Sequence, residues 1–532
     1  MKSKLFTTII TLLSGVVLFS CYEDKGNYDY TTLKTLKIDL PENFKKTYSV
    51  YQSDALEIQP NIVFEGNAAD LKFCWYIFQR DGMINSKLVK ADTISHARNL
   101  NESINVDPER YTLIFSVEDT NTGIKDFASF DVNVQSYVGR GWMVLHGDDN
   151  GGDVDLIISR DVDEDAIEER TLRNIYSRFN GGFPMEGKPM QVCWHSTAEG
   201  VRMFTDKKAA FIETVGFTTL YDYADFFYSP PDVLKFEGYA QCGRNELLVN
   251  NGDVYAINGG TLPNDWKFSY KLLEIVEAPD GLKDSYVSPF LSQTGAYGLW
   301  GVVFDVKHSR FLRVGQYAVN LQLFTEPASN TYPFDMNAIN KNYDLLSMES
   351  GPPASSGFYK YFCIFRDRTN QLTYLYVLSA DTPTTPTHRY PHLERVMSIS
   401  ATDVDDARFF QMSGAAEVLF YGTDKKIYIY NYLADEGDGQ VWSRNSGFVP
   451  EDANEVITSM KLFKYYKTYT MDQTPYPNAL NRLMFVATFN PTTSEGKVYK
   501  IPCNISNGDF DNNNTVIYRG FKKIYDMNAK LK

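Results

Sequence analysis

Short runs of Val, Ile, Phe and Tyr alternate with polar positions along most of the chain, and Gly, Asn and Asp separate the runs. Alternation with a period of two, broken at short intervals by turn residues, is typical of β-strands, and long helical patterns are scarce. Tyr and Phe number 36 and 35 among the 532 residues, which favours strands because aromatic side chains suit a pleated sheet. The pattern therefore predicts an all-β protein.

The first region of this pattern, residues 33–136, predicts a β-sandwich. The stretch "LKFCWYIFQR" places Trp75 in a central strand, and "YTLIFSVEDTNTGIKDFASFDVNVQS" contains two alternating strands joined by an Asn-Thr-Gly turn. About seven short strands within roughly 100 residues, with a buried Trp, are typical of an immunoglobulin-like sandwich.

The pattern changes at residue 137 to a longer repeat, in which two apolar strands flank a turn of Gly, Asn, Asp or Lys. Seven such hairpins occur, at residues 141–159, 189–213, 244–259, 297–315, 359–379, 416–433 and 481–503. Hairpins that recur at intervals of roughly 40–65 residues are typical of a β-propeller, whose radial stacking protects the sheet edges. Residues 137–532 are therefore predicted to form a seven-bladed propeller. The uneven spacing leaves six or eight blades open, and a second array of sandwiches is the alternative fold.

Residues 1–20 follow the pattern of a secretory signal peptide. Lys2 and Lys4 precede an uncharged, mostly apolar run that is shorter than the roughly 20 residues of a membrane-spanning helix. The run ends in "LFSC", which resembles a bacterial lipobox, where the thiol is acylated and the chain is cut before it. Cys21 is thus the predicted lipidation site, and a plain signal peptide with a chance cysteine is the alternative.

Residues 21–32 are polar and rich in Gly, Asn and Tyr, which predicts a lipidated tether rather than a folded segment. A diacylglyceryl group and an N-acyl chain such as palmitate supply more than one lipid anchor, enough for stable membrane attachment. Glu23 and Asp24 directly follow the cysteine and resemble the surface-export signal of Bacteroidetes lipoproteins. We therefore expect an outer-membrane protein that is anchored by lipid and faces the cell exterior.

Two stretches carry a resemblance to a known family. "YTLIFSVEDTNTG" resembles the late strands of PKD domains, and together with "CYEDKGNYDY" at residues 21–30 it is similar to the PKD-like lipoproteins of Bacteroidetes. The resemblance is strongest over residues 21–145. It implies an accessory component of a SusCD-type nutrient uptake system, with transporter subunits as partners and a glycan or a peptide as ligand.

Charge and cysteine usage narrow the function classes. The formal net charge of −15 argues against nucleic-acid binding, which requires basic surfaces that displace phosphate counterions. Once Cys21 is lipidated, five widely separated cysteines remain and no C-x-x-C pair exists, which argues against a disulfide framework and a cysteine zinc site. The expectation is buried free thiols and no bound metal.

The sequence contains no recognisable catalytic constellation. Gly182, Gly187 and Lys188 have phosphate-loop spacing, but Pro189 stands where the magnesium-binding hydroxyl is required. A G-x-S-x-G nucleophile motif is absent from the sequence. We therefore predict no catalytic residue and no cofactor.

Two acidic stretches offer the hard oxygen ligands that calcium prefers. The residues concerned are Asp148, Asn150, Asp153 and Asp155, and then Asp161, Asp163 and Asp165. Neither stretch has the Gly and Glu positions of an EF-hand loop, so we interpret both as solvated hairpin turns without a bound ion.

Two surface features are predicted. Residues 216–236 form an unusually aromatic loop, whose rings could stack on sugars or receive peptide side chains; the alternative is that they fill the gap between two blades. The rings concerned are Tyr221, Tyr223, Phe226, Phe227 and Tyr228. Separately, Asp92-Thr93-Ile94 resembles the O-glycosylation sequon of Bacteroidetes secreted proteins, which implies glycosylation at Thr93.

The sequence thus favours a non-catalytic surface lipoprotein, in which the sandwich is a spacer and the propeller binds a ligand or docks a partner. Two alternatives stay open. One is a propeller-type polysaccharide hydrolase or lyase, and the other is a purely structural partner of an outer-membrane transporter. Fold-level analogy alone does not decide among them.

Overall fold

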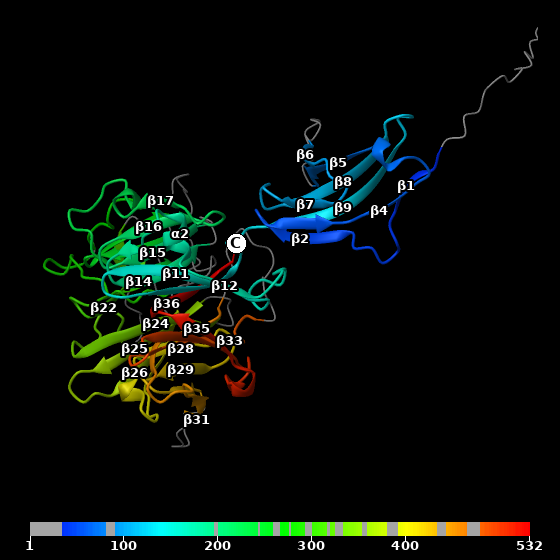
Figure 1. The fold of residues 1–532 in the computed structure, drawn as a ribbon. Coiled ribbons are helices and arrows are strands. Elements are labelled where there is room, and N and C mark those ends of the chain that lie inside the picture. The colour runs from blue at the N-terminus through cyan, green and yellow to red at the C-terminus, as the bar shows by residue number, and fades with distance from the viewer. Residues whose placement is uncertain are drawn as a thin grey trace, which may run out of the picture. The chain divides into compact units, whose positions relative to one another are not determined.

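The structure is a computed structural model that describes thirteen stretches of the chain. These are residues 34–80, 91–195, 200–242, 245–258, 267–275, 278–292, 301–315, 320–324, 333–353, 359–379, 392–433, 443–464 and 479–531. Internal contacts divide the chain into two compact units, Met1–Val134 and Gln135–Lys532 (Figure 1). Each unit has its own hydrophobic core, so each is described by itself.

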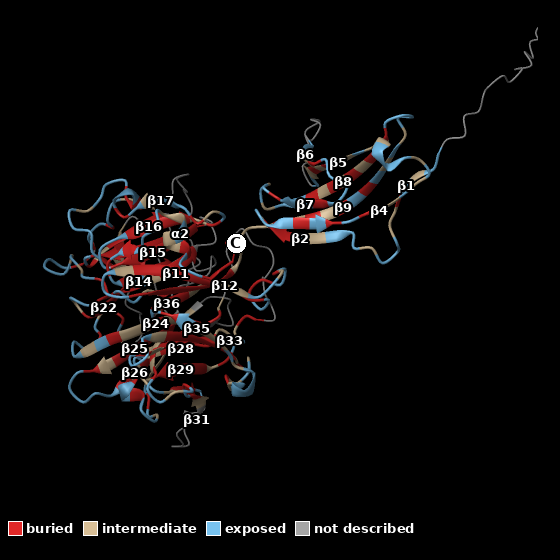
Figure 2. Ribbon diagram, in the orientation of Figure 1, coloured by how far each residue is buried: buried red, intermediate tan, exposed pale blue. Residues whose placement is uncertain are grey.

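The first unit is a sandwich of short antiparallel strands. Its strands are β1 (Leu36–Asp39), β2 (Thr47–Tyr51), β3 (Ala55–Ile58), β4 (Asn61–Phe64), β5 (Leu71–Gln79), β6 (Asp92–Ser95), β7 (Leu100–Ser103), β8 (Arg110–Asp119) and β9 (Lys125–Gln135). A five-stranded sheet in the order β2-β9-β8-β5-β6 accompanies two small sheets, β1-β4 and β3-β7. Along β8, buried and partly exposed residues alternate, as expected of a sheet with one face in the core (Figure 2).

Trp75 occupies the centre of this core and is fully buried. Its ring stacks on Phe115 with centroids 4.4 Å apart, and its indole N–H donates to the carbonyl of Ala97 at 2.9 Å. Burying a large aromatic ring while satisfying its polar atom stabilises a sandwich core at no hydrogen-bonding cost. The predicted immunoglobulin-like or PKD-like sandwich with a central Trp75 is confirmed.

The second unit consists of seven antiparallel sheets among its described residues, which we number as blades in chain order. Blade 1 contains β10 (Gly141–Gly147), β11 (Gly151–Ile158) and β12 (Arg170–Leu172), and short β13 (Met185–Glu186) pairs with β11. Blade 2 contains β14 (Pro189–His195), β15 (Gly200–Thr205), β16 (Ala209–Glu213) and β17 (Thr219–Asp222). Blade 3 contains β18 (Phe236–Cys242), β19 (Asn245–Asn250) and β20 (Asp253–Asn258).

Blade 4 contains β21 (Gly301–Asp305), β22 (Arg310–Val314) and β23 (Leu321–Leu323). Blade 5 contains β24 (Tyr343–Pro353), β25 (Tyr359–Asp367), β26 (Thr373–Ser379) and β27 (His392–Ser398). Blade 6 contains β28 (Phe409–Met412), β29 (Val418–Gly422), β30 (Ile427–Asn431) and β31 (Ser443–Phe448). Blade 7 contains β32 (Val456–Leu462), β33 (Leu483–Asn490), β34 (Glu495–Pro502) and β35 (Val516–Phe521).

The last strand, β36 (Lys523–Lys530), closes the ring by joining blade 1 rather than blade 7. It pairs antiparallel with β10 and becomes the first strand of that sheet, in the order β36-β10-β11-β12 (Figure 1). Along its other side β36 contacts the first strands of the two flanking blades, β14 and β32. First strands that meet around a centre, with closure by the last strand of the chain, define a β-propeller.

The hairpin turns repeat a local design. In blades 4, 5 and 7 a polar residue ends the first strand of a hairpin, and its side chain accepts from the backbone N–H two residues on: Asp305, Asp367 and Asn490. Four residues later the backbone of a non-glycine residue occupies the left-handed region, with φ of 52° at Ser309, 61° at Gln371 and 57° at Ser494. Short polar residues stabilise such turns by accepting hydrogen bonds from backbone N–H groups. The turns could be predicted from the sequence for this reason.

The predicted all-β class and the seven-bladed propeller are confirmed. Each of the seven predicted hairpins lies in a different blade. The sequence treated the hairpins as equivalent and did not indicate that β36 completes blade 1. Among the described residues, no helix has the length and apolar character that a membrane crossing requires.

Candidate functional site

A cavity of about 140 Å³ lies at the centre of the propeller. Its walls come from β10, β14, β18, β24, β28, β32 and β36, so the sheets of six of the seven blades contribute side chains to it. Strands at the centre of a propeller present their side chains to a shared channel, where residues far apart in sequence meet. This channel cavity is the candidate functional site.

Charged and amide side chains gather at the wall in three groups, which we together call the polar belt: Glu349, Gln411 and Lys464; Lys461 and Asp526; and Gln191. All of them line the cavity except Asp526, which pairs with Lys461. The first part of the polar belt links blades 5, 6 and 7. Lys464 Nζ lies 2.6 Å from Glu349 Oε2, and Gln411 Nε2 donates to Glu349 Oε1 at 2.9 Å. The side-chain oxygen Oε1 of Gln411 accepts from the backbone N–H of Leu462 at 3.2 Å. Both oxygens of Glu349 are therefore held by side chains of blades 6 and 7.

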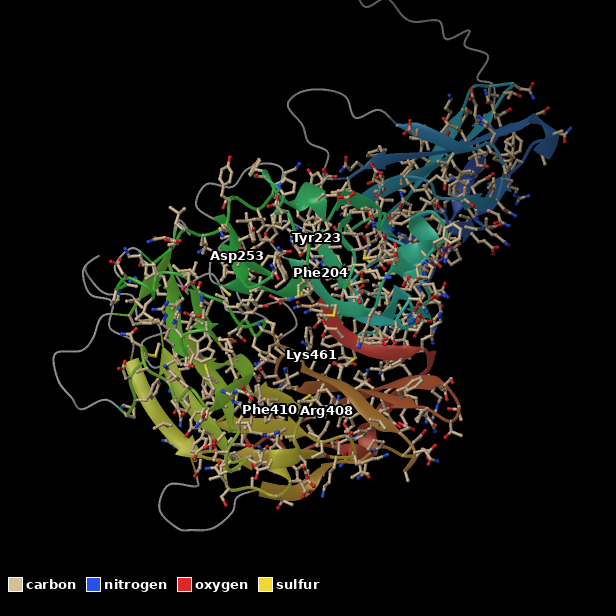
Figure 3. The ribbon with its side chains drawn as sticks, turned by 90° about the vertical axis from the view of Figure 1, so that its left-hand side faces the viewer. Phe204, Tyr223, Asp253, Arg408, Phe410 and Lys461 are labelled. Atoms are coloured by element: carbon tan, nitrogen blue, oxygen red, sulfur yellow. The ribbon has the colours of Figure 1, made fainter. Side chains whose placement is uncertain are left out.

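The second part of the polar belt links blades 7, 1 and 2. Lys461 Nζ lies 3.2 Å from Asp526 Oδ1 on β36, and Asp526 Oδ2 accepts from the backbone N–H of Val192 on β14 at 3.1 Å. Lys461 keeps 34% of its side-chain surface accessible, and Figure 3 shows it near the C-terminal strand. The Asp526 charge is the main reason that the pKa of Lys461 is raised above its ordinary value. Lys461 therefore stays an ammonium ion inside the channel.

Gln191 extends the polar belt to blade 3. Its amide donates to the carbonyl of Tyr239 at 2.9 Å and accepts from the backbone N–H of the same residue at 3.2 Å. It also approaches the thiol of Cys193 at 3.1 Å. Burial raises the pKa of that thiol far above its ordinary range, so Cys193 is a neutral packing group rather than a nucleophile.

The remaining wall combines open amides with apolar side chains. Gln241 on β18 and Asn528 on β36 line the cavity, and their side chains make no hydrogen bond within the described stretches of the chain. Trp142 and Trp194 also line the cavity, but both are buried, and the ring of Trp142 stacks on Phe485 with centroids 3.8 Å apart. Accessible apolar surface comes from Leu291, which is half-buried. The site thus offers neutral hydrogen-bonding groups and apolar surface beside paired charges.

The structure disperses the aromatic residues that the sequence singled out. Tyr223, Phe226 and Phe227 are buried, Tyr221 is half-buried, and Tyr228 is 53% exposed. The buried rings pack with strands of blades 2 and 3 in one hydrophobic cluster, which is the alternative role that the sequence left open (Figure 3). They lie against a core and have no free face for a ligand.

A buried ion pair explains why so many rings gather there. Arg202 and Glu246 are both almost fully buried, with Nη2 and Oε2 2.9 Å apart. The guanidinium lies 4.7 Å from the ring centroid of Phe211 and 5.0 Å from that of Phe226. Cation–π contact and the carboxylate together compensate the desolvated charge, so these aromatics stabilise the packing of blade 2 against blade 3.

The first acidic stretch differs from its interpretation as solvated turns, since Asp153 and Asp155 are buried. Asp153 accepts from the backbone N–H groups of Tyr176 and Ser177 at the start of the short helix α2 (Ile175–Phe179). Asp155 accepts from Arg173 Nη1 at 2.7 Å and lies 2.9 Å from His146 Nε2. Burial raises the pKa of Asp155, but His146, the Asn174 N–H and Arg173 outweigh it and hold that pKa below its ordinary value. Both carboxylates therefore serve the fold, and no metal-binding cluster of acids, His and Cys occurs in the described part of the chain.

Of the two predicted modification sites, the structure describes one. Thr93 is exposed on β6, opposite Tyr76 of β5. Its glycosylation stays a prediction, as no contact in the structure bears on it. Cys21 lies outside the described residues, and so its lipidation also stays a prediction.

The sequence missed the channel residues, although a signal exists. Lys461 stands in a strand whose other residues are largely apolar, "VITSMKL", and Glu349 and Asp526 each follow or precede a Met in their strands. A charge inside an apolar strand indicates an inward-facing polar site or a buried ion pair. Nothing local indicates which partner such a charge meets.

Comparison with models of known families gives a match to the N-terminal part of the chain. The model of the PKD-like family matches residues 21–189, which span the sandwich unit and reach the first strands of the propeller. The N-terminal unit is therefore PKD-like. No curated protein matches the chain.

Several solved structures resemble the chain in fold only. A quinonprotein alcohol dehydrogenase-like protein from Bacteroides thetaiotaomicron is 11% identical, with 93% of this chain and 99% of that chain covered, at a TM-score of 0.41. Apo AztD from Citrobacter koseri is 12% identical, with 86% and 98% covered, at a TM-score of 0.35. The Dos1 propeller is 10% identical, with 75% and 79% covered, also at 0.35. At these values the likeness carries no argument about function.

Proposed function

We propose that this protein is a non-catalytic binding protein of the cell surface, and that its propeller holds a small ligand or the end of a larger one in the channel cavity. The observation that supports this most is the polar belt. Its ionic groups are committed to one another, whereas Gln241 and Asn528 are open. Paired charges fix the shape of the wall, and open amides are the groups that fix the orientation of a ligand.

The same pairing favours binding over catalysis. A general acid or base needs a group that exchanges a proton near the working pH. Glu349 is held by Lys464 and Gln411, and Asp526 by Lys461 and the Val192 N–H. Both oxygens of each carboxylate are held by contacts within the protein, which suits a structural role. A polysaccharide hydrolase or lyase is the alternative, and formation of product would favour it.

The proposed setting is the outer membrane. The "LFSC" stretch and the acidic residues after Cys21 support a lipid anchor that displays the protein at the exterior. There the PKD-like unit would act as a spacer, and the propeller would serve a SusCD-like uptake system for glycan or peptide. In this setting Cys21→Ala is expected to move the protein from the membrane fraction to the soluble fraction. Retention of the variant in membranes would contradict the lipid anchor.

The binding role is tested with the Cys21→Ala chain against arrays of glycans and peptides, followed by titration of each hit. We expect a saturable hit without product over hours, and loss of affinity in Gln241→Ala. Tyr228→Ala is the matched control, because Tyr228 is exposed and lies outside the channel cavity. Product formation would replace the proposal with the enzyme alternative. A hit that depends on Tyr228 instead of Gln241 would place binding on the aromatic loop.

A further inference from the structure

The channel cavity also indicates which chemical class of ligand it takes, an inference that rests on the binding role proposed above. Four charged residues belong to the polar belt, two of each sign: Lys461, Lys464 and Glu349 line the cavity, and Asp526 pairs with Lys461. Each ammonium group already faces a carboxylate, at 3.2 Å and 2.6 Å. The two ion pairs together therefore carry no net charge that an ion could neutralise.

An ionic ligand is disfavoured for this reason. A lone carboxylate, phosphate or ammonium group would leave water and enter a site whose opposite charges are already compensated. It would have to compete with a group that is already paired and leave the displaced group without its partner. The energetic consequence is selection against acids and amines.

A zwitterion meets a second obstacle. An amino acid would have to open both pairs at once, placing its carboxylate on a lysine and its ammonium on Glu349 or Asp526. The second oxygen of each carboxylate is held by another blade, from Gln411 and from the Val192 N–H. Opening the pairs would therefore disturb contacts that hold blades 1, 2, 5, 6 and 7 together.

The groups that stay open are neutral and of mixed character. The amides of Gln241 and Asn528 each offer two N–H donors and one carbonyl acceptor. They lie on β18 and β36, on either side of β14, which contacts both strands. A hydroxyl group both donates and accepts, so a ligand with several hydroxyls can satisfy two such amides without charge.

The apolar part of the wall and the size of the cavity further restrict the class of ligand. The half-buried Leu291 supplies apolar surface to the wall, which suits the C–H faces of a saturated ring. The volume of about 140 Å³ is below the roughly 300–1,000 Å³ of sites for drug-sized ligands. The cavity suits one ring rather than a chain of them.

We propose that the channel cavity binds a single neutral, polyhydroxylated ring, such as one unmodified sugar residue, through the amides of Gln241 and Asn528. The charged members of the polar belt position the wall and are not ligand-exchange groups. An oligosaccharide would enter by its terminal residue.

Isothermal titration of the Cys21→Ala chain tests this with rings that differ only in charge. The probes are glucose, galactose, mannose and xylose as neutral rings, glucuronate as an anion, glucosamine as a cation, and leucine and glutamine as zwitterions. We expect saturable binding of at least one neutral sugar, and at least tenfold weaker binding of the charged rings. Gln241→Ala and Asn528→Ala should each weaken that binding at least fivefold, and Tyr228→Ala should leave it unchanged.

A charge-switch variant keeps the test independent of folding defects. Asn528→Asp has the same shape and adds one negative charge to the wall, so its preference should shift from the neutral ring toward glucosamine. Glucuronate or an amino acid bound as tightly as any neutral sugar by the parent chain would overturn this inference and leave the binding role intact. Binding of no probe would also overturn it, whereas the binding role itself is judged by the glycan and peptide arrays.

Discussion

At the scale of single residues, the burial of a ring separates packing from binding within one aromatic loop. Phe226 is fully buried against Arg202 and Phe204, and Tyr228 is exposed two positions later. Phe226→Ala should therefore cost about 3–5 kcal/mol of unfolding free energy, because it leaves a cavity beside a buried charge. Tyr228→Ala should stay within about 0.5 kcal/mol. Urea unfolding of both variants checks this, and equal midpoints would contradict the assignment.

Lys530 is a second residue whose environment has a measurable consequence. It is fully buried on β36, where its ammonium nitrogen donates to the carbonyls of Val138 and Gly139, both at 2.9 Å. Burial lowers its pKa to about 7, against the opposite effect of Glu213 and Asp163 and with the help of Arg140. Between about pH 7 and its ordinary value of 10.5, the unfolded chain binds a proton that the folded chain does not. The Lys530 contribution to stability therefore rises with pH across that window and is least favourable below it.

Lys530→Met removes this titration. We expect its unfolding free energy to rise less between pH 7 and pH 10 than that of the parent chain, by an amount on the order of a few kcal/mol. Urea midpoints at pH 6, 8 and 10 for both chains give the comparison, since other titrating groups contribute equally and cancel in the difference. Parallel pH profiles would show that Lys530 does not change its proton affinity on folding.

At the scale of elements, the hairpin turns share one design but differ in the further contacts that the turn residue makes. Asp305 ends β21, caps the N–H of Lys307, and also accepts from Arg310 at 2.9 Å, with both side chains almost fully buried. Asp367 ends β25 and caps the N–H of Thr369. Asp305→Ala should cost about 3–5 kcal/mol because it leaves Arg310 buried without its carboxylate. Asp367→Ala should cost about 1 kcal/mol for one turn bond.

Thermal and urea unfolding of the two alanine variants measure this difference. Asp305→Asn serves as the control, since it keeps an oxygen for the turn and loses only the charge, and it should fall between the two. Similar losses for Asp305→Ala and Asp367→Ala would mean that the ion pair with Arg310 contributes little beyond the turn.

The same elements show which parts of this structure can be predicted from the sequence. A hairpin is a local event: two alternating strands and a short polar turn such as Asp305 to Ser309 lie within one window, and all seven hairpins were recognisable. The polar belt is not local. Lys464 and Glu349 are 115 positions apart, and Val192 and Asp526 are 334 apart. Only closure of the ring brings them together, so periodicity cannot pair them.

At the scale of the whole molecule, one strand holds the propeller closed. β36 contributes Ile524 and Met527 to the blade 1 core, supplies Asp526 to the polar belt, and covers the edge of β10. Removing it takes away the burial of these two apolar side chains, worth roughly 3–6 kcal/mol, and frees the edge of β10. Since a domain is stable by only about 5–15 kcal/mol in total, this loss is decisive.

A chain that ends at Lys522 should therefore lack the cooperative unfolding transition of the propeller, although every blade from 2 to 7 keeps its described strands. Differential scanning calorimetry and near-ultraviolet circular dichroism record that transition. Lys523→Ala in the full-length chain is the matched control, because Lys523 lies on β36 but is exposed and should leave the transition in place. Addition of the β36 peptide to the truncated chain should restore part of the signal, because the vacated edge of β10 is its pairing site. An unchanged transition in the truncated chain would mean that the packing of adjacent blades, rather than closure by the last strand, holds the ring.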